Sequence, residues 1–178
     1  MEIYLIRHTT PLITKGLIYG QMDVKLADTF LEEKEIICKQ LPISLNAIYS
    51  SPSSRCSQLA SRIALTYPEI IYKEDKALYE LNFGDWEGQT WDTVNRNDSE
   101  IWMNDFVNLS PPNGETMLQM QSRVLTFWAA LLLQPHEKVA VITHGGVIRI
   151  LLAHQRSIAL KDAFSINVNM GEVVKLLI

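Results

Sequence analysis

Two apolar, strand-like segments of the sequence each run into a histidine. Residues 3–6 lead into Arg7-His8, and residues 139–142 lead into Thr143-His144-Gly145-Gly146. In open parallel α/β sheets, ligands bind outside the carboxyl ends of the strands. We therefore expect the two histidines to lie at one edge of a sheet and to share a single site.

Two arginines are candidates for the same site. Arg7 directly precedes His8, and Arg55 lies in the first turn of an expected helix, where a cation opposes the helix dipole unless an anion binds there. Guanidinium groups match phosphate oxygens in charge and shape. The helix that follows His144 could add backbone donors. These residues predict a phosphate pocket that needs no cofactor and whose cationic character disfavours a metal ion.

These groups suggest a specific kind of chemistry. A neutral imidazole can attack phosphorus, provided that its other ring nitrogen carries the proton and is held by an acceptor. Guanidinium groups would stabilise charge on the phosphoryl oxygens. An acid must protonate the leaving oxygen and later deprotonate water. Glu80, Asp85 and Glu87 are the candidates, and the residues alone leave the choice among them open.

Length and composition limit the class of protein. The chain has 178 residues, of which 47% are hydrophobic and 20% charged, which predicts one globular domain over residues 1–178. A net charge of −4 argues against nucleic acid or an anionic membrane as the partner. Cys38 and Cys56 form neither a metal-binding spacing nor a disulfide framework. With no signal peptide or spanning segment apparent, we expect a cytoplasmic protein.

Strand-like and helix-like segments alternate along the chain. We expect strands at residues 2–7, 47–50, 70–72, 138–143, 164–168 and 173–178, and helices at 28–41, 53–64, 117–131 and 146–154. Asp28 is the expected N-cap of the first helix. The alternation predicts an α/β three-layer sandwich with a mainly parallel sheet, helices on both faces and the last strand at an edge.

Two segments lack periodicity. Residues 9–25 contain Pro11, Gly16 and Gly20 and read as a long loop, which is usually functional in a compact domain. Residues 86–114 are interpreted as an insertion that covers the site, with a short helix around Trp102 and Phe106.

Several other polar residues are assigned structural roles. His154 shares an apolar helix face, which favours core packing or helix capping, and Glu115 has the place of a first-turn helix acid. His136, Arg62 and Arg149 are expected to face solvent or, for the arginines, to form salt bridges.

Five segments resemble, in this order, the motifs of the histidine phosphatase superfamily, the phosphoglycerate mutase-like proteins. They are Leu5–His8 (LIRH), Ser51–Arg55 (SPSSR), Leu78–Gly88 (LYELNFGDWEG), Asn113–Thr116 (NGET) and Thr143–Gly146 (THGG). The resemblance spans nearly the whole chain and implies a phosphoglycerate mutase-like fold. It implies that His8 is the phosphorylated nucleophile, that Arg7, Arg55 and His144 bind the phosphoryl group, and that Glu80 is the proton donor.

Within the superfamily, three segments look most like the α-ribazole phosphatases of cobalamin synthesis, which remove the 5′-phosphate of α-ribazole phosphate. They are Arg7–Pro11 (RHTTP), Tyr19–Leu26 (YGQMDVKL) and Leu81–Glu87 (LNFGDWE). The substrate-binding residues expected from this resemblance are Arg7, Thr14, Gly20, Gln21, Arg55, His144 and Gly145.

Other functions stay open at this point. The same motifs fit a sugar-phosphate phosphatase or a phosphoglycerate mutase-type enzyme, and a non-catalytic phosphate-binding module is the alternative of another class. Thr9 stands where the family commonly has glycine, and Thr14 where mutase-type members have asparagine. Both departures count against a mutase more than against hydrolysis. The expected partner is a small-molecule phosphomonoester, and the sequence leaves open whether the chain forms a homodimer.

Overall fold

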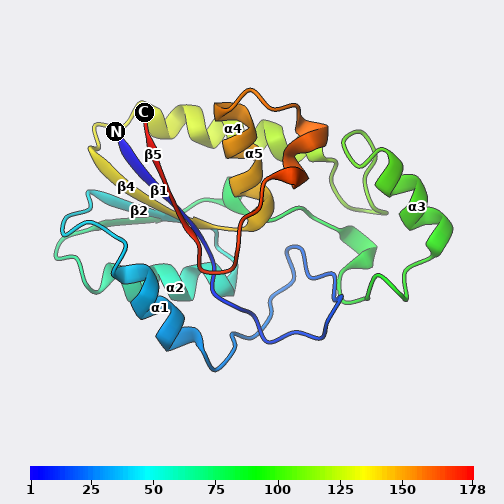
Figure 1. Cartoon of the computed structure of the whole chain (residues 1–178), viewed down its shortest axis with the longest axis horizontal. Helices are drawn as coiled ribbons and strands as arrows, with labels where there is room; N and C mark the ends of the chain where they lie inside the picture. Colours follow the sequence, from blue (N-terminus) through cyan, green and yellow to red (C-terminus); the bar gives the residue numbers. More distant parts are fainter.

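A mainly parallel sheet of five strands runs through the middle of the molecule (Figure 1). The computed structural model describes residues 1–178. The strand order is β3-β2-β4-β1-β5. The strands are β1 (Glu2–Arg7), β2 (Ala47–Ser50), β3 (Ile71–Glu74), β4 (Lys138–Thr143) and β5 (Val173–Leu177). The first four are parallel and β5 pairs antiparallel with β1 at the edge, as the sequence predicted.

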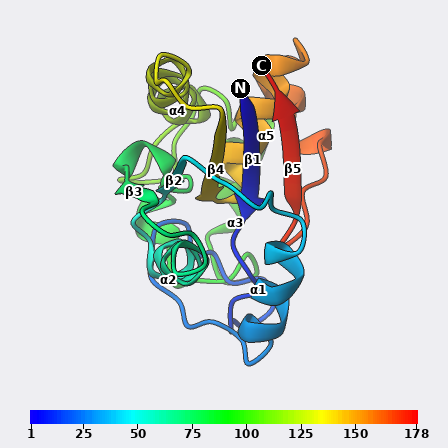
Figure 2. The ribbon, with the colours of Figure 1, turned by 90° about the vertical axis from the view of Figure 1, so that its left-hand side faces the viewer.

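Helices cover both faces of this sheet (Figure 2). On one face lie α1 (Phe30–Cys38) and α2 (Ser54–Ala64), and on the other lie α4 (Met117–Leu132) and α5 (Gly145–Gln155). Helix α3 (Arg96–Asn104) stands to the side of the sandwich. Short 3₁₀ helices occupy Lys76–Leu78, Gly84–Trp86 and Leu160–Ser165. The predicted three-layer sandwich is confirmed.

The alternation of side chains along β1 builds two cores. Ile3 and Leu5 belong to a large apolar cluster with residues of α4 and α5, whereas Tyr4 and Ile6 belong to a second cluster with residues of α2. Successive strand residues point to opposite faces, so a strand buried on both faces must be apolar throughout. This explains why residues 3–6 show no polar position.

The carboxyl ends of the three central strands meet at one edge of the sheet. In the parallel register Arg7 of β1 stands beside Thr143 of β4, and Ser50 of β2 beside Ile142 of β4. The chain therefore leaves β1, β2 and β4 at neighbouring points, and the residues that follow each strand start close together. The loop of residues 8–28 passes below this edge in Figure 1.

Some expected boundaries differ from the structure. Helix α1 begins at Phe30, and its N-cap is Thr29 rather than Asp28, without a side-chain hydrogen bond. Residues 164–168 do not form a strand. Ile166 and Val168 are buried in the core, but their carbonyls accept hydrogen bonds from Arg149 and Arg7 instead of a neighbouring strand. The short helix α3 ends before Phe106.

No helix in the structure combines the length and the apolar character needed to traverse a lipid bilayer. The two chain ends lie side by side, where the Met1 amino group donates to the carbonyl of Ile178 (Figure 1).

Two loops that flank the sheet edge are in backbone contact at Gly84, which gives a stability prediction. A Cβ on Gly84 would lie 2.1 Å from the Pro112 carbonyl oxygen, whereas a Cβ on Gly16 would meet nothing within 4 Å. Both glycines have positive φ, so alanine costs each about 1–2 kcal/mol of backbone strain. We expect Gly84→Ala to lower the free energy of unfolding by a further ~1–3 kcal/mol from overpacking. Denaturant unfolding of the two variants measures this difference, and equal losses would contradict the contact.

Candidate active site

Four residues predicted from the sequence converge at the sheet edge. The ring centroids of His8 and His144 are 5.3 Å apart, and Nη2 of Arg55 lies 3.1 Å from Nδ1 of His144. His8, Arg55 and His144 are all buried. Arg7 ends β1, and its charge acts on both histidines by lowering their pKa values. The sequence-based prediction of one shared site is thus supported by the geometry.

His8 is held in one tautomer. Its Nδ1 lies 2.8 Å from the backbone carbonyl oxygen of Thr9, which can only accept, so Nδ1 carries the proton and Nε2 keeps a lone pair. Burial, then the charges of Arg55 and Arg7, lower the pKa of His8 to about 3. The imidazole is therefore neutral near pH 7, as a nucleophile must be.

His144 is neutral in the opposite tautomer. Its Nδ1 faces the Arg55 guanidinium, which can only donate, so Nε2 must carry the proton and donate to Oγ of Ser51 at 2.9 Å. Burial and then the charge of Arg55 hold the pKa of His144 well below its usual value. His144 thereby fixes the guanidinium of Arg55 from one side.

Three donors lack a partner, two of them on the sequence neighbours of His8 and one on Arg55, which contacts His144. Nε of Arg7, Nε of Arg55 and the hydroxyl of Thr9 are buried without a hydrogen bond. Each such group costs about 1–3 kcal/mol if it stays unsatisfied. An anion with several acceptor oxygens, such as a phosphoryl group, satisfies donors of this kind.

Arg55 holds a loop over the site. Its Nη1 and Nη2 donate to the carbonyls of Met22 (2.9 Å) and Gly20 (2.5 Å), and its guanidinium lies 5.0 Å from the ring centroid of Tyr19. The start of α2 differs from the prediction. The backbone N–H of Ser54 donates to the carboxylate of Asp23 at 2.9 Å, so a protein group already serves as the anion at this helix start.

The three candidate acids have different surroundings. Glu87 accepts hydrogen bonds from the backbone N–H groups of Gln21 (2.8 Å), Met22 (2.7 Å) and Phe83 (3.1 Å), which makes it a link between two loops. Asp85 is exposed and accepts from the side-chain amide of Asn113 at 2.8 Å. Neither carboxylate faces the cavity described below.

Glu80 is the acid that faces the cavity. Its Oε1 accepts from the N–H of Leu81 (3.0 Å) and its Oε2 from the N–H of Gly146 (3.1 Å) in the first turn of α5. A backbone donor that the sequence assigned to a phosphate is thus bound to this carboxylate instead. The geometry favours Glu80 over the other two acids, in agreement with the family resemblance.

An apolar cavity of about 200 Å³ is lined by Glu80 and by Gly146, which lies two positions after His144. Nine of its 13 lining residues are hydrophobic, among them Leu17, Ile18, Leu81, Phe83, Trp91 and Phe164. Neither histidine lines it. The cavity can therefore hold the organic part of a substrate whose phosphoryl group reaches the histidines.

The predicted substrate-binding residues are only partly brought together. Gly20 lines the cavity, and Gly145 lies under the arginines, since a Cβ there would meet Nη1 of Arg149 at 2.7 Å and Cζ of Arg7 at 3.2 Å. Gln21 lies behind the cavity and donates to the backbone carbonyl of Glu80 at 3.0 Å. Thr14 is exposed and does not line the cavity, so its predicted contact with substrate is not supported.

Arg149 belongs to the site, although the sequence analysis assigned it to solvent or a salt bridge. It lines the cavity, forms no ion pair and donates from Nε to the carbonyl of Ile166 at 2.9 Å. Burial and the charge of Arg7 lower its pKa. The signal was its spacing, because a residue four positions after Gly145 lies over it on the same helix face.

The segment 86–114, predicted to cover the site, contributes only one residue to the cavity. Only Trp91 of this segment lines the cavity. Trp86 is buried in edge-to-face contact with Trp91 and Trp102, at centroid distances of 6.2 and 5.7 Å. The rest of the segment therefore builds an aromatic cluster beside the site, and α3 lies outside it (Figure 1).

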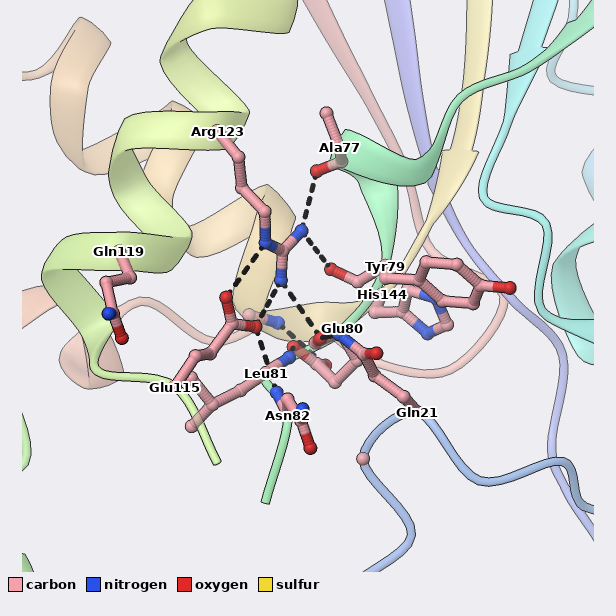
Figure 3. Close-up of polar contacts among 12 residues, drawn as sticks. Gln21, Ala77, Tyr79, Glu80, Leu81, Asn82, Glu115, Gln119, Arg123 and His144 are labelled. Atoms are coloured by element: carbon pink, nitrogen blue, oxygen red, sulfur yellow. Dashed lines mark hydrogen bonds and ion pairs between the residues drawn. The ribbon is translucent and has the colours of Figure 1, made fainter. Parts of the chain in front are cut away.

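Two further residues differ in part from the prediction. His154 is exposed in the last turn of α5, so of its two predicted roles, core packing or helix capping, core packing is wrong. Glu115 precedes the N-cap Thr116 of α4 and bonds to Arg123, which the sequence analysis did not single out (Figure 3). No group of three or more histidine, cysteine or carboxylate side chains is arranged to hold a metal ion.

Comparison with known proteins gives consistent results. A model of the histidine phosphatase superfamily (branch 1) matches residues 3–178. The chain is 27% identical to the adenosylcobalamin/alpha-ribazole phosphatase of Escherichia coli K12, covering 96% of this chain and 87% of that protein. It is 30% identical to the metal-independent phosphoserine phosphatase of Arabidopsis thaliana, over 83% of this chain and 66% of that protein.

The fold has a matching solved structure. The alpha-ribazole phosphatase of Shigella flexneri superposes with a TM-score of 0.88 and 25% identity, covering 98% of this chain and 89% of that one.

The buried His8 should make stability depend on pH. Its pKa is about 3 in the folded chain and near 6.5 when unfolded, so between these values the unfolded chain binds a proton that the folded chain does not. Stability should therefore fall as pH drops from 6.5 towards 3, by up to about 1.4 kcal/mol per pH unit. His144 contributes in the same direction because its pKa is also lowered, so we expect His8→Asn to reduce, without removing, the slope measured by denaturant unfolding between pH 7 and 4.5.

The matched control is His154→Asn, because His154 is exposed. This variant should keep the slope of the wild type. A His8→Asn slope equal to the wild-type slope would contradict the buried, neutral state of His8.

Proposed function

The chain belongs to the histidine phosphatase superfamily and is a phosphoric monoester hydrolase, and on that premise we propose that it works through a phosphohistidine at His8. The observation that supports this most directly is the free Nε2 of His8, in a cluster whose residues or their neighbours carry three buried donors without partners, on Arg7, Thr9 and Arg55. A tetrahedral anion bound by those donors would place phosphorus next to a neutral nucleophile.

The proposed reaction has two steps. Nε2 of His8 attacks phosphorus, the ester P–O bond breaks, and Glu80 gives its proton to the leaving oxygen. In the second step Glu80 takes a proton from water, the water oxygen attacks phosphorus and the P–N bond breaks, which releases phosphate. Arg7 and Arg55 stabilise the charge on the phosphoryl oxygens in both steps.

As substrate we propose α-ribazole 5′-phosphate. Two observations support it: the similarity to alpha-ribazole phosphatases of Escherichia coli and Shigella flexneri, and the apolar character of the cavity beside Glu80. α-Ribazole carries a planar, apolar bicyclic base on its ribose. An aromatic wall suits such a base.

Trp91 is the proposed contact for that base. It lines the cavity, is 40% exposed, and stacks on Trp102 with an interplanar angle of 26° at 5.9 Å. Trp102 therefore supports the Trp91 ring and leaves it able to stack on a ligand. Base–aromatic stacking contributes about 1–3 kcal/mol.

Phosphoserine is a second candidate, for a different reason. Arg149 brings a guanidinium without a carboxylate partner to the cavity, and a substrate carboxylate could fill that role. A phosphoserine phosphatase of Arabidopsis thaliana is also among the similar proteins.

We propose a cytoplasmic location, which is consistent with the free thiols of Cys38 and Cys56.

A substrate panel tests the specificity. We expect kcat/KM to be highest for α-ribazole 5′-phosphate, compared with ribose 5-phosphate, phosphoserine and 3-phosphoglycerate. Trp91→Ala should raise KM for α-ribazole 5′-phosphate about 10-fold, through lost stacking, and leave ribose 5-phosphate unchanged. Faster turnover of phosphoserine or a sugar phosphate by the wild type would reject the first substrate.

Metal chelation tests the mechanism. The groups proposed to contact phosphoryl oxygens are two guanidinium groups and one hydroxyl, so turnover should persist in excess EDTA and be abolished in His8→Ala. Circular dichroism of the variant serves as the folding control. A loss in EDTA that a divalent cation restores would overturn the metal-free mechanism. A wild type inactive on every phosphomonoester would favour a binding module.

A further inference from the structure

The side chain of Arg123 uses all of its N–H donors within one small region (Figure 3). Nε and Nη2 form a two-pronged ion pair with the carboxylate of Glu115, at 3.0 and 2.6 Å. Nη1 donates to the carbonyls of Ala77 and Tyr79, both at 2.7 Å, and Nη2 also donates to the carbonyl of Glu80 at 3.0 Å. Arg123 therefore binds three backbone carbonyls that lead up to the proposed acid.

Further bonds fix the other side of Glu80. The Glu115 carboxylate accepts from the backbone N–H of Asn82 at 2.9 Å, and the side-chain amide of Gln21 donates to the carbonyl of Glu80 at 3.0 Å. The backbone is thus held at residues 77, 79, 80 and 82 by groups from outside the segment. From this fixed backbone the carboxylate of Glu80 accepts a hydrogen bond from the N–H of Gly146 at 3.1 Å.

The support for this arrangement is rigid. Arg123 lies in the second turn of α4, and α4 starts with a capping box in which Thr116 and Gln119 bond to each other's backbone. Both side chains of the Arg123–Glu115 pair are largely buried, with 22% and 16% exposed. The position of Glu80 is therefore tied to a helix of the sandwich rather than to its own irregular loop.

Net stability alone does not explain a pair of this kind. Burying two charges costs desolvation that their attraction only partly repays, so apolar residues of similar volume often do as well. Position matters more for a proton donor, since it must come within about 2.6–3.2 Å of the leaving oxygen. Displacement by about 1 Å can cost 10²-fold in rate.

We propose that Arg123 and Glu115 are positioning residues that set the place of Glu80 for proton transfer. The ion pair, defined as the Arg123–Glu115 clamp, fixes the backbone of residues 77–82 and thereby aims the carboxyl group at the leaving oxygen. This inference rests on the proposed role of Glu80 as the acid. It predicts that variants which loosen the clamp lower kcat/KM most for substrates whose leaving oxygen must be protonated.

The test compares leaving groups in three variants. Arg123→Lys keeps the charge but not the fork, and Glu115→Gln keeps the shape but not the charge. Arg96→Lys is the matched control, because Arg96 forms an exposed pair with Glu100, with side chains 90% and 54% exposed. For each enzyme, kcat/KM is measured with 4-nitrophenyl phosphate, a good leaving group, and with an alkyl phosphomonoester, a poor one.

We expect Arg123→Lys and Glu115→Gln to lower kcat/KM for the alkyl ester by about 10–100-fold and for 4-nitrophenyl phosphate by less than about 3-fold. Arg96→Lys should leave both values unchanged. Equal losses on both esters, or a lower melting temperature with an unchanged ratio, would overturn the positioning role. So would failure of both clamp variants to fold, which would assign the clamp to stability.

Glu80→Gln separates this inference from the proposed function. If Glu80→Gln lowers kcat/KM equally for the two esters, the proposed acid role of Glu80 is rejected, and the positioning role of the clamp is rejected with it. If it discriminates strongly while the clamp variants do not, the acid role stands and the positioning role of the clamp is rejected.

Discussion

Positive charge buried without a matching carboxylate is the constraint on which the rest of this structure depends. Two guanidinium groups stand beside two imidazoles at the carboxyl ends of three neighbouring strands, and the Nε atoms of Arg7 and Arg55 lack partners. Burial first, and then the charge of Arg55, lower the pKa values of His8 and His144 and keep both imidazoles neutral. These features suit the binding of an anion and leave His8 in the neutral form that the proposed mechanism requires.

The acid side of the site is built by a different means. Loops rather than strands carry its residues. Hydrogen bonds from side chains, instead of pairing in the sheet, therefore hold the backbone in place. Glu87 ties residues 21–22 to residue 83, and Arg123 with Glu115 holds the backbone around Glu80. In the proposed mechanism the histidine cluster binds the phosphoryl group, and the Glu80 part, which lines the cavity, serves the leaving group.

The histidine cluster could be predicted from the sequence far better than the surroundings of Glu80. The apolar runs that end in His8 and His144 fixed both strands and, through the parallel register, their meeting point. Arg123 gave no such signal, because it bonds to carbonyls 46 and 44 positions away in the sequence, and the only indication for Arg149 was its spacing of four residues from Gly145. Residues 164–168 alternate like a strand but give their carbonyls to arginines, and Thr14, though close to the motif, turns to solvent. The pattern of apolar residues in the sequence predicts secondary-structure elements and where they end. Contacts between loops can be identified only once the three-dimensional structure is known.

The central claim is most directly tested by trapping the phosphorylated enzyme. Acid-labile, alkali-stable phosphate should appear on the chain within one turnover of a ³²P-labelled phosphomonoester, and peptide mapping should place it on His8. The His8→Asn variant should take up no label. Turnover in the wild type without a covalent phosphoryl group, or with the label on another residue, would contradict the account.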